Sequence, residues 1–173
     1  VIGYKMRQAK RRGAKLIVVD PRRIDLAEEA DYWLRIKPGT DIPFLNGLMH
    51  IIIKEDLYDK AFVESRTENF EALAETVKNY TPDYVSKLTG IPEEDLYAVA
   101  RLYATTDRAM TFYTLGITEH VCGTRNVMSI ANLAMLTGHL GRPGTGVNPI
   151  RGQNNVQGAC DMGALPNVYS GYQ

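Results

Sequence analysis

Apolar and polar positions follow two different periods along the first twenty residues. Residues 2–12 place apolar and basic side chains on opposite sides of a helical repeat, and Gly13 then ends the pattern. Residues 15–20 form a nearly continuous apolar run that closes with Asp20 before a proline. Such a run is typical of a strand covered on both faces in a parallel sheet. These features predict the second half of a βαβ unit, whose first strand we expect upstream of Val1.

The same periods predict further elements as far as residue 140. Strand patterns cover residues 32–36 and 109–116, and residues 24–30 suit a short helix or turn. Helical spacing predicts five longer helices, which begin near Asp41, Thr67, Pro82, Pro92 and Asn126. Thr67 is expected to cap the second of them. Strands that alternate with helices over this length predict an α/β fold with a doubly wound, mainly parallel sheet.

The chain changes character after Gly141. Residues 141–173 hold no periodic apolar run and carry only Arg142, Arg151 and Asp161 as charged side chains, among many glycines and amides. A mobile tail is one interpretation, although disordered tails normally combine high charge with low complexity. The composition favours a second interpretation, in which the backbone closely approaches a large polar ligand. Glycine removes the steric limit there, and amides supply both donors and acceptors.

Charge and composition exclude several classes of protein. Lys and Arg together number 20 and so do Asp and Glu, so the chain lacks the basic surplus of a nucleic-acid binder. The longest apolar stretch, residues 45–53, is too short and too interrupted to span a membrane. Cys122 and Cys160 are too few for a disulfide scaffold and belong to no metal-binding cluster. The compartment stays undecided between cytoplasm, which is slightly favoured, and periplasm.

Ligands of open parallel sheets bind outside the carboxyl ends of the strands, and three candidate stretches fall there. They are Asp20, residues 39–41 and residues 115–119. In a dinucleotide fold an acid at the position of Asp20 accepts hydrogen bonds from ribose hydroxyls. An aspartate that only shapes the turn is an equal alternative. Arg22 beside it suits a phosphate or a purine edge, or is simply solvated.

Arg151 is the most informative charge in the glycine-rich segment. A lone guanidinium among neutral amides suits a carboxylate or a phosphate, because its planar fork can hold two oxygens at once. Its alternative is a structural arginine that binds loop carbonyls. The histidines His50, His120 and His139 are scattered, with no second ligand at metal-binding spacing, and no phosphate-loop or GxSxG motif is present.

Two blocks of the sequence resemble one enzyme family. Residues 136–149 (LTGHLGRPGTGVNP) and 151–163 (RGQNNVQGACDMG) resemble the catalytic alpha subunit of molybdenum- or tungsten-dependent formate dehydrogenases, within the dimethyl sulfoxide reductase family of molybdopterin oxidoreductases. Residues 13–22 (GAKLIVVDPR) are similar to the strand-plus-Asp-Pro-Arg motif of that family. The resemblance covers essentially the whole chain, and the block at 151–163 is the part specific to formate dehydrogenases.

The resemblance implies that this chain is a segment of a longer subunit that oxidises formate to carbon dioxide. Residues 1–140 would form its dinucleotide-binding-like α/β domain, and residues 141–173 a cofactor and substrate loop that leads into the next domain. The implied cofactor is bis(molybdopterin guanine dinucleotide) with molybdenum or tungsten. The implied partners are formate, the remaining domains and electron-transfer subunits. A 4Fe-4S cluster belongs to the parent protein, since no cluster cysteine or metal ligand maps onto this segment.

The resemblance also implies roles for single residues. Arg151 matches the arginine that holds the carboxylate of formate beside the metal. Asp20, Arg22, Gly39 and Asp41 would contact the guanosine of one pterin. The residues that would line the rest of the cofactor are Leu115, Glu119, Gly152 and Gln153, with glutamine common in the family at the position of Glu119.

Two other hypotheses remain open. One is a different molybdopterin oxidoreductase, such as a nitrate reductase, although the Arg151 block should then differ. The other is a non-catalytic scaffold relative, as in the large subunit of respiratory complex I. A scaffold has no need of a substrate anion site, so Arg151 speaks against it. A cysteine cluster upstream of Val1, with a cysteine or selenocysteine followed by histidine, would favour the formate dehydrogenase.

We predict that the isolated 173-residue chain does not oxidise formate, because the metal ligand and cluster cysteines of the family do not map onto it. The measurement is formate-dependent reduction of a redox dye by the purified chain. Dye reduction above the rate without formate would contradict the prediction.

Overall fold

The amino-terminal elements follow the apolar pattern closely. The computed structural model describes residues 1–173 and begins with helix α1 (Ile2–Arg11), followed by strand β1 (Ile17–Val19). Gly13 ends the helix with a φ of 98°, and the N–H of the next residue, Ala14, donates to Ala9 O at 3.1 Å. This left-handed turn suits glycine, which carries no side chain to clash.

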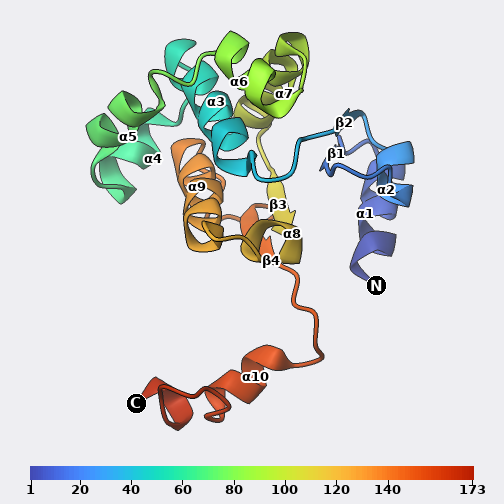
Figure 1. Ribbon diagram of the computed structural model, residues 1–173, viewed down its shortest axis with the longest axis vertical. Coiled ribbons are helices and arrows are strands. Elements are labelled where there is room, and N and C mark those ends of the chain that lie inside the picture. Colours follow the sequence, from blue (N-terminus) through green and yellow to red (C-terminus); the bar gives the residue numbers. More distant parts are fainter.

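A short helix, α2 (Asp25–Glu28), connects β1 to a parallel neighbour. Strand β2 (Tyr32–Leu34) pairs with β1 in the register Ile17↔Tyr32. Both strands therefore point their carboxyl ends in the same direction. This pair and α1 lie on one side of the molecule in Figure 1.

Helix α3 (Asp41–Lys54) forms the centre of the helical layer. It packs against α5 (Phe70–Val77), α6 (Pro82–Thr89) and α7 (Glu93–Thr105), and against α9 (Gly123–Leu136) from the second half of the chain. Helix α4 (Lys60–Arg66) lies against α9 as well. Met49 and Ile52 of α3 are fully buried, and Leu34 brings β2 into the same core.

A second parallel pair completes the body. Strand β3 (Met110–Tyr113) leads into the short helix α8 (Leu115–Thr118) and then α9, and β4 (Gly146–Pro149) returns beside β3 in the register Met110↔Gly146. The predicted α/β class with parallel strands is confirmed. The strands form two separate pairs, β1–β2 and β3–β4.

The chain leaves the body after β4. Helix α10 (Val156–Asp161) and the 3-10 turn η1 (Ser170–Tyr172) pack on each other. Figure 1 shows them at the end of an extended segment, clear of the helical layer. Residues 151–173 are called the arm below. No helix of the protein has the length and apolar character that a bilayer crossing requires.

Some boundaries differ from the sequence predictions. Thr67 does not cap the following helix: its hydroxyl donates to Val63 O at 2.6 Å and so closes α4, while Asn69 precedes α5. The third predicted strand stops at Tyr113, since Leu115 already belongs to α8. Strand β4 and helix α4 were not predicted. A four-residue strand with a glycine and a proline has no apolar pattern, and only its pairing with β3 defines it.

Close contact between α3 and α6 predicts a stability effect at Gly47. A Cβ built on Gly47 would lie 2.9 Å from a methyl of Val85, which is fully buried and cannot move away. Gly47→Ala should therefore destabilise the chain by about 1–3 kcal/mol through overpacking. The measurement is the free energy of unfolding in urea.

Gly3→Ala is the matched control, because Gly3 also lies in a helix but has open space around its Cβ position. It should leave stability unchanged or raise it by up to about 1 kcal/mol through helix propensity. Equal stabilities of the two variants would contradict the packing argument.

Candidate functional site

Asp20 follows β1 and forms a tight turn with Arg22. One carboxylate oxygen, Oδ1, accepts the backbone N–H of Arg22 at 2.7 Å and its Nε at 3.4 Å. The backbone carbonyl of Asp20 accepts the indole N–H of Trp33 at 2.9 Å, which ties the turn to β2. The other carboxylate oxygen makes no hydrogen bond within the chain, and the Arg22 side chain is 79% exposed. These bonds form the turn, and they leave one carboxylate oxygen of Asp20 and the exposed guanidinium of Arg22 available to a ligand.

Asp41 lies in the first turn of α3, the helix that follows β2 in the chain. Gly39 precedes it with a φ of 83°, a conformation that favours glycine. The Asp41 side chain is only 13% exposed, and its Oδ2 lies 4.0 Å from Nε2 of His120. A carboxylate in this position also benefits from the partial positive charge of the helix N-terminus.

His120 connects Asp41 to the segment after β3. Its Nε2 lies 2.8 Å from the carbonyl oxygen of Gly116 in α8. Leu115 and Glu119 of the same segment are exposed. The structure therefore brings the first turn of α3 and the end of the segment after β3 together, although they are far apart in the sequence.

Arg151 leaves the body at the carboxyl edge of the β3–β4 pair. The N–H of Ile150 donates to Tyr113 O at 2.7 Å, and the hydroxyl of Thr114 donates to Ile150 O at 2.6 Å. These two bonds anchor the start of the arm beside Leu115. Beyond this anchor the side chain of Arg151 bonds only to Gln157, at 3.2 Å. Gly152 and Gln153 are exposed, and Figure 1 shows their segment leading away from the body.

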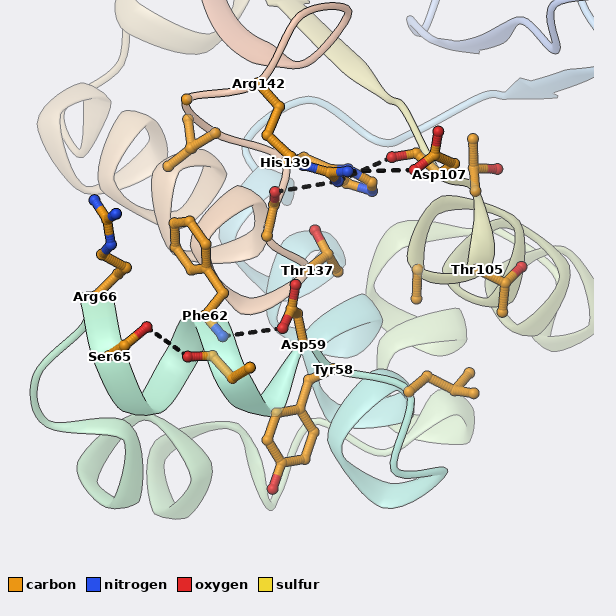
Figure 2. A pocket seen from close by; sticks show the side chains of 17 residues that line it. Tyr58, Asp59, Phe62, Ser65, Arg66, Thr105, Asp107, Thr137, His139 and Arg142 are labelled. Carbon is orange, nitrogen blue, oxygen red and sulfur yellow. Dashed lines mark hydrogen bonds and ion pairs between the residues drawn. The ribbon is translucent and has the colours of Figure 1, made fainter.

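A separate cavity lies elsewhere in the molecule. It measures about 650 Å³ and lies between α4 and the ends of α7 and α9. Figure 2 shows Arg142 reaching Asp107 inside it, through contacts of 3.2 Å to Oδ1 and 2.9 Å to the carbonyl. Asp59 caps α4 through the N–H of Phe62 at 2.9 Å. None of the site residues predicted from the sequence lines this cavity, and Asp59, Asp107 and Arg142 within it already serve local structure.

His139 lines the same cavity and is a core histidine. Its side chain is 1% exposed, and its Nε2 lies 2.9 Å from the carbonyl oxygen of Tyr103. Burial of the neighbouring Tyr103 raises the pKa of that phenol. No group of three or more His, Cys, Asp or Glu side chains could hold a metal ion in this chain.

Asp31 clamps the β1–β2 pair to α1. Its carboxylate accepts the ammonium of Lys10, the ammonium of Lys15 at 3.2 Å and the backbone N–H of Leu16 at 2.8 Å. The hydrogen bond from Lys10 is the main cause that holds the pKa of Asp31 well below its usual value of 3.8. This clamp fixes the strand whose end carries Asp20.

Sequence reasoning missed two residues beside the predicted site. His120 has no acid or second histidine at metal-ligand spacing in the sequence, yet the fold brings Asp41 to it. Gln157 was seen only as one of many amides. Its signal was the presence of Asp161 one helical turn later, since residues four apart face each other on a helix.

The model of the family described as molybdopterin oxidoreductase matches residues 1–172. The chain is 50% identical over its full length to the F420-dependent formate dehydrogenase 1 subunit alpha of Methanococcus maripaludis and to formate dehydrogenase H of Escherichia coli. It spans 26% and 24% of their lengths, about a quarter of each. The fold matches acetylene hydratase from Pelobacter acetylenicus with a TM-score of 0.77 and 34% identity, over 80% of this chain and 19% of that one.

The Asp31 clamp predicts a pH-dependent stability. Because the pKa of Asp31 is lowered in the folded state, its contribution is fully present above about pH 4 and is lost as the pH falls further. Asp31→Asn should therefore lower the free energy of unfolding at pH 7 by about 1 kcal/mol, since the amide keeps an acceptor for Leu16 but loses the charge.

The measurement is urea unfolding of both proteins between pH 7 and about pH 2. The difference between wild type and variant should shrink below about pH 4. A difference that stays constant down to the lowest pH would contradict the clamp.

Proposed function

The chain belongs to the molybdopterin oxidoreductase family, and on that premise we propose that it is part of the catalytic subunit of a formate dehydrogenase. The proposal rests on sequence identity. Over its full length the chain is identical at half of its positions to proteins named as formate dehydrogenases. The fold alone would not suffice, because a hydratase shares it. In this proposal residues 1–140 form the dinucleotide-binding-like domain, and residues 141–173 lead into the next domain.

The family implies a molybdopterin cofactor with a metal, and the first strand pair suits the nucleotide end of such a group. We assign the guanosine of a molybdopterin guanine dinucleotide to Asp20, Arg22, Gly39 and Asp41. The free carboxylate oxygen of Asp20 can accept N–H or hydroxyl donors of a guanosine, and Arg22 carries an unpaired guanidinium edge. Gly39 adds a backbone turn with open space at its Cβ position. These residues therefore fit the group.

The remaining contacts of the cofactor are assigned to the edge of the second strand pair. Leu115 and Glu119 lie there, and the arm begins there with Arg151 and continues through Gly152 and Gln153. The exposed carboxylate of Glu119 can accept pterin N–H groups, as the amide oxygen of a glutamine could. Molybdenum or tungsten, the 4Fe-4S cluster and the electron-transfer subunits belong to the rest of the proposed enzyme.

When bound, the metal-pterin group supplies the acceptor for the two electrons that leave formate as its C–H bond breaks to give carbon dioxide and a proton. Arg151 provides what this chain contributes to the reaction. Its fork can bind both oxygens of formate and so direct the C–H bond towards the acceptor. Its fixed positive charge also attracts the anionic substrate to the site. Binding and orientation are thus its two roles.

Arg151→Ala in the full-length enzyme tests this role. We predict that kcat/KM for formate falls by about 10²-fold, as for the loss of other charge-stabilising donors. Arg151→Lys should lie between alanine and wild type, because an ammonium keeps the charge but not the fork. Steady-state kinetics on enzyme with equal metal and pterin content are the measurement.

The control is Arg12→Ala. Arg12 is exposed at the end of α1, forms no ion pair, and lies far from Arg151 in the sequence. It should leave kcat/KM unchanged. If Arg151→Ala also keeps kcat/KM within about threefold of wild type, Arg151 is not the substrate-binding residue.

A further inference from the structure

Four side chains of the arm form one hydrogen-bonded chain that begins at Arg151. Nη2 of Arg151 donates to Oε1 of Gln157 at 3.2 Å. The amide nitrogen of Gln157 donates to Oδ1 of Asp161 at 3.0 Å and to the hydroxyl oxygen of Tyr172 at 2.8 Å. The Tyr172 hydroxyl in turn donates to the same Asp161 oxygen at 2.7 Å. Gln157 therefore connects the guanidinium to a closed triangle of polar groups.

The orientation of the Gln157 amide is determined from both of its ends. A carboxylate only accepts hydrogen bonds, so the NH₂ group must face Asp161. A guanidinium only donates, so the carbonyl oxygen must face Arg151. A reversed amide would set two donors against each other at one end and two acceptors at the other. The triangle thus fixes which atom Arg151 meets.

The protonation states agree with this arrangement. Hydrogen bonds from Tyr172 and Gln157 hold the pKa of Asp161 below its usual range, so it stays a carboxylate at neutral pH. The hydrogen bond to Asp161 raises the pKa of Tyr172, so its hydroxyl keeps the proton that it donates.

The backbone of the arm brings these groups together without help from the body. Helix α10 places Gln157 and Asp161 one turn apart on the same face. The chain then reverses through Gly163, which has a φ of 91°, and the hydroxyl of Ser170 donates to Met162 O at 2.9 Å. This reversal carries Tyr172 back to α10. The arm is therefore a local unit whose internal bonds lead to Arg151.

We propose that Gln157 is the positioning residue of Arg151, and that Asp161 and Tyr172 hold its amide in the required orientation. The proposal rests on the proposed role of Arg151 in binding formate. A neutral amide directs the guanidinium without cancelling its charge, so the charge remains available to an anionic substrate. A carboxylate at the same position would pair with Arg151 and compete with formate.

Gln157→Glu in the full-length enzyme is the most direct test. KM for formate should rise by roughly tenfold, because the new carboxylate occupies the fork, while kcat at saturating formate changes much less. Gln157→Leu removes the contact without adding charge, so its KM should rise less than that of the glutamate variant. Tyr172→Phe should also raise KM, because the amide loses one of its two anchors.

Asn167→Asp is the control for added charge, because Asn167 is exposed in the same arm and has no bond to the Arg151 chain. It should leave KM and kcat unchanged. Metal and pterin content and thermal melting are measured for every variant. If Gln157→Glu yields no loaded enzyme, Gln157→Leu and Tyr172→Phe decide: unchanged KM in both overturns the proposal.

Arg151→Ala distinguishes a failure of the role proposed for Gln157 from a failure of the role proposed for Arg151. If it raises KM but Gln157→Glu leaves KM within about twofold of wild type, the positioning role of Gln157 is wrong and that of Arg151 stands. If Arg151→Ala itself leaves KM unchanged, the proposed substrate site is wrong. A rise of KM in Gln157→Glu equal to that in Asn167→Asp would show a general charge effect and also overturn the positioning role.

Discussion

The burial of α3 on several sides is the constraint on which the rest of the body depends. Helices α5, α6, α7 and α9 all pack against it, and Gly47 lets α6 approach so closely that a methyl group would not fit. A helix held in this way cannot rotate or slide. Its first turn therefore fixes Asp41, whose Oδ2 lies 4.0 Å from Nε2 of His120. The position of the candidate site follows from core packing, because its acid belongs to the most buried helix.

Elements with a strong apolar period could be predicted from the sequence. The strand before Asp20 and the helix from Asp41 to Lys54 are examples, since their burial dictates their residues. Strand β4 could not be predicted, because its four residues become a strand only through pairing with β3. The contact between Asp41 and His120 was also out of reach, as it joins segments that only the fold brings together. Local patterns thus gave the candidate residues, and long-range packing decides which of them meet.

The protein divides its candidate chemistry between a body and an arm. On the body, Asp20 follows β1, Asp41 begins the helix after β2, and residues 115–119 follow β3. In parallel sheets nucleotides bind beyond the carboxyl ends of the strands. Arg151 belongs to the arm, whose own hydrogen bonds orient it. The body resembles that of a hydratase, so the fold is compatible with more than one reaction. We infer that the arm supplies the part of the site that selects an anionic substrate.

The most direct test of the central claim is a cryo-EM structure of the full-length enzyme with its cofactor bound. The account predicts guanosine density within hydrogen-bonding distance of Asp20 and Asp41. The guanidinium of Arg151 should lie at the metal, with Gln157 still in contact with it. Guanosine bound away from the ends of β1 and β2, or Arg151 remote from the metal, would contradict it.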